Sequence, residues 1–158
     1  MLEISPHRLK IVVIEPEIPQ NTGNIARLCA VSGAELHLVR PLGFFLSERH
    51  LKRAGMDYLD EVRLTVHDDL AALRAVMGPA GFWLASAKAS KSLWEAEFRA
   101  DDWLILGRET AGLPAGLLAE NAERCVRIPQ QAGARCLNLA TAAGIFLYEA
   151  LRQVGLNR

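Results

Sequence analysis

The chain has few cysteines, no metal-ligand spacing and no excess of charge of either sign. Its three cysteines, Cys29, Cys125 and Cys136, include no C-x-x-C pair, and its four histidines are scattered. This pattern is typical of a reduced protein, and we predict that no metal is bound. Eighteen basic residues balance eighteen acidic ones. Any contact with a nucleic acid must therefore come from local patches and not from a global positive field.

Long apolar runs are also missing. No hydrophobic stretch approaches the length that spans a membrane, and the first residues lack the charged-then-apolar pattern of a signal peptide. We expect a soluble, cytoplasmic protein with no membrane partner. With 51% hydrophobic and 23% charged residues, a chain of 158 residues can build one packed core. We predict a single domain over residues 1–158.

Standard catalytic and nucleotide-binding signatures are absent as well. The sequence has no G-x-G-x-x-G after its first apolar run, no G-x-x-x-x-G-K-[ST] and no G-x-S-x-G. These absences disfavour a dinucleotide-binding fold, a P-loop NTPase and an α/β-hydrolase. No Ser/His/Asp or Cys/His arrangement can be argued from the residue order, so hydrolytic chemistry is disfavoured in general.

Short apolar runs that alternate with helical patterns are what the chain does have. Strands are predicted over residues 10–14, 35–39, 63–66, 82–85, 103–106 and 125–128, and helices over 23–32, 47–53, 69–77, 114–121 and 137–154. Ser47 and Asp68 are candidate caps for two of the helices. Such alternation predicts an α/β fold with a parallel sheet flanked by helices on both faces.

The last predicted helix, residues 137–154, is apolar on nearly every side. A helix that is apolar all round is expected to be buried all round, and a sheet covers only one of its faces. The alternative is an ordinary C-terminal helix docked on the sheet. We predict that a second copy of the chain covers the other face, in a homodimer.

Two polar loops follow predicted strands and suggest one composite site. Residues 21–27 come after the first strand and residues 107–114 after the strand 103–106. Open α/β sheets bind ligands beyond the carboxyl ends of their strands. Arg27 is the candidate catalytic residue, although it could also be a surface residue of an amphipathic helix. Gly107, Gly112 and Gly133 permit either a close approach to a ligand or ordinary tight turns.

Several other candidates have a structural alternative. Glu109 could favour the N-terminus of the following helix, Asn138 could cap the last helix, and Cys136 could be a small buried residue. Two basic patches are present, and each alone is typical of a solvated face. They consist of Arg49, His50, Lys52 and Arg53, and of Lys88, Lys91 and Arg99.

Three longer motifs carry a resemblance that spans essentially the whole chain. They occupy residues 15–29, residues 106–114, and residues 127–129 with 135–140; the segments 42–44 and 53–58 support them. Together they resemble the SPOUT class of RNA methyltransferases, and within it the TrmL (YibK-like) tRNA methyltransferases. These enzymes 2′-O-methylate the wobble nucleotide, cytidine 34 or uridine 34, with S-adenosyl-L-methionine.

The resemblance implies a SPOUT fold with a deep C-terminal trefoil knot, a homodimer and a tRNA anticodon stem-loop as substrate. It implies catalytic roles for Arg27 and Asn138. An arginine keeps its proton, so Arg27 is expected to orient the hydroxyl and to stabilise developing charge. Cofactor contacts are implied for Leu84, Gly107, Glu109, Gly112, Ile128, Cys136 and Leu137. Substrate contacts are assigned to Asn21, Asn24, Arg108 and Arg135.

The chain departs from the family pattern at the cofactor loops. Residues 134–138 read Ala-Arg-Cys-Leu-Asn where close relatives commonly have Ser-Arg-Ser-Met-Asn, and Arg108 replaces a proline. The replacement of serine by Ala134 and Cys136 keeps backbone contacts but removes hydroxyl contacts. Two alternatives stay open at this point: a catalytically silent RNA-binding dimer, and a flavodoxin-like nucleotide-binding protein.

Overall fold

A seven-stranded parallel sheet forms the centre of the computed structural model, which describes residues 3–47, 49 and 59–155. The strand order is β3-β2-β1-β6-β4-β7-β5, and every pairing between these strands is parallel. The strands are β1 (Lys10–Ile14), β2 (Glu35–Val39), β3 (Leu64–His67), β4 (Phe82–Ala85), β5 (Lys91–Ser92), β6 (Trp103–Leu106) and β7 (Cys125–Arg127). The predicted parallel α/β architecture is confirmed.

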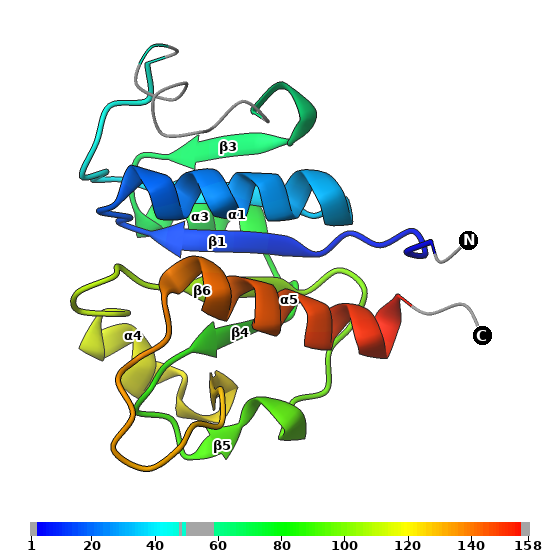
Figure 1. Cartoon of the computed structure of the whole chain (residues 1–158), viewed down its shortest axis with the longest axis vertical. Coiled ribbons are helices and arrows are strands. Elements are labelled where there is room, and N and C mark those ends of the chain that lie inside the picture. Colours follow the sequence, from blue (N-terminus) through cyan, green and yellow to red (C-terminus); the bar gives the residue numbers. More distant parts are fainter. Residues whose placement is uncertain (1–2, 48, 50–58, 156–158) are drawn as a thin grey trace.

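Helices cover both faces of the sheet. The helix α1 (Pro19–Ser32) and the helix α5 (Leu139–Val154) lie side by side on one face (Figure 1). The shorter helices α3 (Leu70–Met77) and α4 (Ala115–Glu120) pack on the other face. Neighbouring residues of β1 point to opposite faces, so Ile11 belongs to one core cluster and Val12 to the other. The near-continuous apolar strands follow from this burial on two sides.

Some element boundaries differ from the predictions. The helix α1 begins at Pro19, four residues before the predicted start, because a proline suits the first helical turn. Asp69 caps α3 by accepting from the Ala72 backbone, so the predicted cap Asp68 is wrong. Strand β3 begins one residue later and β7 ends one residue earlier than predicted, and α4 begins after Pro114. Strand β5 was not predicted, since two polar residues carry no periodicity.

Part of the predicted organisation lies outside the described residues. The helix predicted over residues 47–53 and the segment 53–58 belong almost entirely to that part of the chain. The same holds for His50, Lys52 and Arg53 of the first basic patch. In the described part of the chain, no helix is long and apolar enough to cross a membrane.

Within the single chain the helix α5 is buried on one side only, and burial of its other side by a second copy stays a prediction. Its buried residues are Ala143, Phe146, Leu147, Ala150 and Leu151. A stripe of Thr141, Ile145, Tyr148 and Arg152 stays exposed on the opposite side. Ile145 is 39% and Tyr148 47% exposed in this stripe. Two sizeable apolar side chains on one exposed helix face are consistent with a surface that a second protein covers.

Candidate functional site

A cavity of about 500 Å³ opens at the carboxyl ends of β4, β6 and β7. The loops that follow these strands gather at one edge of the sheet, where the strand arrows in Figure 1 point. The cavity is lined by residues 85–88, 106–113, 126–128 and 130, together with Ile18, Asn21, Leu118 and residues around the start of α5. The volume falls within the range of about 300–1,000 Å³ that is usual for small-molecule sites. The predicted composite site at the strand ends is therefore present as a cavity.

The loop after β6 is a tight turn that two glycines make possible. Arg108 and Gly112 exchange backbone hydrogen bonds, of 3.3 Å and 2.9 Å, and close the turn. Gly112 has a φ of +66°, in the left-handed region that favours glycine. A Cβ atom at Gly107 would lie only 2.1 Å from the carbonyl carbon of Gly112. Both glycines are thus needed for the turn itself, which presents its backbone to the cavity.

Glu109, in the middle of this turn, caps the helix α1. Its carboxylate accepts hydrogen bonds from the backbone N–H groups of Glu17, at 2.8 Å, and Ile18, at 3.1 Å. The helix has no acidic residue in its first turn, and its N-cap residue Ile18 makes no side-chain cap. A carboxylate at this position complements the partial positive charge of the helix N-terminus. Glu109 therefore serves α1, which precedes it in the chain, and not the helix that follows it.

An amide bridge joins Glu109 to the start of α5. The Asn21 side chain donates from Nδ2 to Glu109 at 3.3 Å and accepts at Oδ1 from Asn138 Nδ2 at 2.9 Å. Asn138 in turn accepts at Oδ1 from the backbone N–H groups of Ala140 and Thr141. The capping role considered for Asn138 is thus confirmed. Its Nδ2 retains a second hydrogen, because Asn21 uses only one of the two.

The structure brings most of the predicted site residues to one place. Nine of them line the cavity: Asn21, Gly107, Arg108, Glu109, Gly112, Ile128, Cys136, Leu137 and Asn138. Asn21 is only 6% exposed and both ends of its amide are engaged, which leaves it poorly placed for the predicted contact with RNA.

Four predicted residues do not line the cavity. Leu84 is fully buried in the core, and Ala85 to Lys88 take its place in the lining. Asn24 and Arg27 lie on the exposed side of α1, and Arg135 lies on the exposed loop before α5. A single chain therefore does not place Arg27 beside the cavity.

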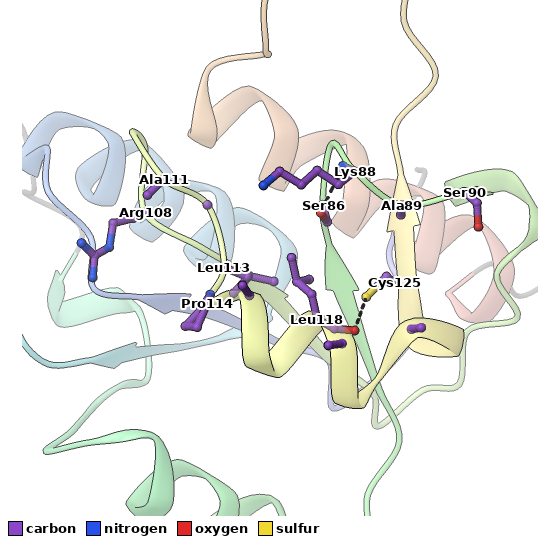
Figure 2. Close-up of a pocket in the computed structure, with 14 residues that line it drawn as sticks. Ser86, Lys88, Ala89, Ser90, Arg108, Ala111, Leu113, Pro114, Leu118 and Cys125 are labelled. Carbon is purple, nitrogen blue, oxygen red and sulfur yellow. Dashed lines mark hydrogen bonds between the residues drawn. The ribbon is translucent and has the colours of Figure 1, made fainter.

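The prediction from sequence missed the loop that follows β4. Ser86, Ala87 and Lys88 line the cavity, and so does Thr110. The end of the strand 82–85 is followed by polar residues, as are the ends of the strands 10–14 and 103–106, and this signal identifies it. A second cavity, of about 680 Å³, lies between this loop and α4. Figure 2 shows Lys88 extending across it from the β4 loop toward Ala111, while Arg108 points away.

The cysteines offer no activated nucleophile in the core. Burial raises the pKa of the Cys29 thiol to about 12 and also raises the pKa of Cys125. Cys125 donates to the backbone oxygens of Leu118 and Asn121. A thiol that is neutral at physiological pH is a poor nucleophile. Cys136 differs, because it is exposed and lines the cavity.

A histidine pair lies away from the cavity, between β2 and β3. His37 Nδ1 and His67 Nε2 are 2.9 Å apart, and His37 Nε2 is 3.1 Å from Glu35. Both rings are buried, and burial lowers the pKa of each. Within the described residues, no group of three or more histidine, cysteine or acidic side chains is arranged to hold a metal.

Known proteins are similar to the chain over nearly its whole length. The SpoU rRNA Methylase family matches residues 8–148. A tRNA (cytidine(34)-2′-O)-methyltransferase from Beijerinckia indica is 46% identical over 147 residues, which are 92% of this chain and 91% of the relative.

Two solved structures extend the similarity to three dimensions. A structure that describes 2-OH methylation of C/U34 on tRNA is 47% identical, with a TM-score of 0.88, and the match covers 94% of this chain and 97% of that one. An AdoMet-bound rRNA methyltransferase from Sinorhizobium meliloti is 27% identical, with a TM-score of 0.80. The match covers 96% of this chain and 58% of the methyltransferase chain.

Proposed function

The chain belongs to the SpoU rRNA Methylase family, and from this premise we propose that it is a tRNA 2′-O-methyltransferase that modifies nucleotide 34. The support is a relative of that name at 46% identity and a neighbour concerned with C/U34 at 47% identity. The observation that carries the proposal is the Glu109–Asn21–Asn138 network, which joins all three motifs at one cavity. A flavodoxin-like protein would need no such network.

The cavity suits S-adenosyl-L-methionine as the cofactor. Its aliphatic part, formed by Leu106, Val126, Ile128, Leu137 and Leu139, can enclose an adenine ring, and its polar part is rich in backbone N–H and C=O groups. Gly107 and Gly112 keep the turn free of side chains where the backbone would approach the cofactor. When bound, the cofactor supplies a sulfonium methyl group that the 2′-oxygen of ribose attacks in line.

The residues of the chain then orient the reacting groups. Asn138 keeps one N–H of its amide free of Asn21, and we assign this donor to the 2′-oxygen. Asn138 cannot rotate freely, because its oxygen is held by two backbone N–H groups of α5. Exposed Asn24, Arg108 and Arg135 remain our candidates for contacts with the tRNA anticodon stem-loop.

Arg27 is assigned to the active site of a partner subunit. It lies on the exposed side of α1, the helix that packs against α5, and outside the cavity of its own chain. A homodimer built on these two helices would cover the exposed stripe of α5 and bring Arg27 to the neighbouring cavity. There its positive charge would orient the hydroxyl and stabilise the developing alkoxide. Each active site would thus consist of the cavity of one subunit and Arg27 of the other.

We also propose that the C-terminal part of the chain is a trefoil knot. The support is the position of β7, which inserts between β4 and β5 although it follows both in sequence. From there the chain passes along the cavity and crosses back over the middle of the sheet, where α5 packs on β6 and against α1 (Figure 1). True knots are rare, so this threading is best tested by a solved structure of the chain.

The decisive experiment incubates the protein with labelled S-adenosyl-L-methionine and unmodified tRNA. The methylated nucleotide is then mapped by mass spectrometry, and we expect the label on the ribose of nucleotide 34. A methyl group elsewhere in the tRNA would refute the assignment of the substrate. Binding of RNA without any transfer would instead support the catalytically silent dimer, which the enzymatic names of relatives at this identity disfavour.

Subunit mixing tests the role of Arg27. Arg27→Ala and Asn138→Ala homodimers are each expected to be inactive. A heterodimer of the two contains one cavity with an intact Asn138 that faces an intact Arg27 from the partner. Recovery of activity on mixing therefore supports a shared site. No recovery, with subunit exchange demonstrated by mass spectrometry, would place Arg27 in the site of its own chain.

A further inference from the structure

Three consecutive side chains of the turn after β6 all reach the segment that precedes α1. Arg108 forms an ion pair with Glu15, and Glu109 accepts from the backbone of Glu17. Thr110 donates to Glu17 Oε1 from its hydroxyl, at 2.6 Å, and from its backbone N–H, at 3.3 Å. The contact is reciprocal, because each of the two glutamates accepts from the backbone of the opposite loop.

Glu17 is the one member of this reciprocal pair that does not line the cavity. It is held from its other side as well. The Gly43 backbone N–H donates to Pro16 at 2.9 Å, and a Cβ at Gly43 would lie 2.9 Å from the Glu17 Cα. The Glu17 backbone therefore has no room to retreat from the turn. Its carboxylate and that of Glu109 together hold the turn against the start of α1.

The position of the turn relative to α1 determines how the side-chain amides of Asn21 and Asn138 are oriented. Thr110 and Glu109 are neighbours in one tight turn, so a shift of Thr110 moves Glu109. Glu109 fixes which end of the Asn21 amide faces Asn138, since only the Nδ2 end can donate to a carboxylate. An Asn21 that lost this contact could rotate and present its donor to the donor of Asn138. The hydrogen bond between the two amides would then be lost.

We propose that Glu17 is a positioning residue for methyl transfer, acting through Thr110 and Glu109 on the orientation of Asn138. The inference rests on the proposed function, because it assigns Asn138 to the reacting oxygen. Glu17 touches neither the cavity nor the assigned RNA-contact residues. Its loss is therefore expected to lower kcat and to leave the KM for tRNA unchanged.

The test compares Glu17→Ala, Thr110→Val and the double variant in steady-state methyl transfer. A hydrogen bond to a charged group typically corresponds to a tenfold or larger effect, and we expect each single variant to lower kcat about tenfold. The double variant should be no slower than Glu17→Ala alone, since Glu17→Ala already removes both hydrogen bonds that Thr110 donates and Thr110→Val removes one of them. Thr110→Ser keeps the hydroxyl and should retain nearly full kcat. Glu120→Ala, at an exposed ion pair with Arg74, is the matched control.

Several results would overturn the inference. These are an unchanged kcat in Glu17→Ala, a multiplicative loss of about a hundredfold in the double variant, or a loss in Thr110→Ser equal to that in Thr110→Val. A lower melting temperature with full kcat per folded protein would also refute it, because Glu17 would then be only structural. Absence of transfer by the wild type would instead refute the proposed function. The inference would then fail together with the proposed function, whereas normal transfer by the wild type with an unchanged kcat in Glu17→Ala refutes the inference alone.

Discussion

Removal of the Glu109 carboxylate tests whether a residue of the β6 loop stabilises the helix α1. In Glu109→Ala, the backbone N–H groups of Glu17 and Ile18 lose their acceptor, and so does the buried amide of Asn21. A lost N-cap typically costs about 1 kcal/mol. A buried amide left without its partner costs roughly another 1 kcal/mol, at the low end of the usual range because Glu109 is half-exposed.

The expected loss in the free energy of unfolding is therefore about 2 kcal/mol, or about 4–8 °C in Tm for a domain of this length. Thermal and urea unfolding should be followed by circular dichroism at one protein concentration, because a dimer makes Tm depend on concentration. Glu109→Gln retains an acceptor and should lose about half as much. Glu97→Ala, at an exposed glutamate, should change stability by less than about 0.5 kcal/mol. If Glu109→Ala unfolds like this control, the capping role is wrong.

Three further predictions concern the turn, the histidine pair and the exposed thiol. Gly107→Ala should abolish binding of S-adenosylhomocysteine in calorimetry, because its Cβ would overlap the turn, whereas Gly116→Ala, with nothing within 4 Å of the new Cβ, should bind normally. Burial lowers the pKa of His37 and His67, so the unfolded chain binds more protons below its ordinary histidine pKa of about 6.5. The free energy of unfolding in urea should be highest above that pH and fall as the pH drops through it. In a His37→Leu/His67→Leu variant, this free energy should depend less on pH. Cys136 should react with N-ethylmaleimide more slowly when S-adenosylhomocysteine fills the cavity, and equal rates would place the cofactor elsewhere.

Local patterns were sufficient for most of the secondary structure. The strands 10–14, 35–39, 82–85 and 103–106 were predicted with their observed bounds, because each is a short apolar run closed by turn residues. The strand β5 could not be found in this way. Lys91 and Ser92 form a strand only because β7 lies beside them, and the paired residues, Lys91 with Val126 and Ser92 with Arg127, are 35 positions apart in the chain.

The loops of the site were also predictable, but the partners within them were not. A glycine-rich turn after a strand marks Gly107 and Gly112 as backbone positions near a ligand. Nothing in the sequence indicates that Glu109 caps a helix about ninety residues before it. The local pattern favoured the following helix, because capping rules describe contacts within a few residues. In the folded chain the two strand ends adjoin, and the carboxylate reaches α1 instead.

The amino-acid sequence by itself determined the class of fold, the family and the loops that form the site, because periodicity and motif residues are local properties of the chain. Tertiary structure alone decided how the motif residues are used. It turned Asn21 from an expected RNA contact into a buried link, placed Leu84 in the core and left Arg27 outside its own cavity. The physical reason is that β1 and β6 are neighbours in the sheet, so residues some ninety positions apart exchange hydrogen bonds at the ends of these two strands.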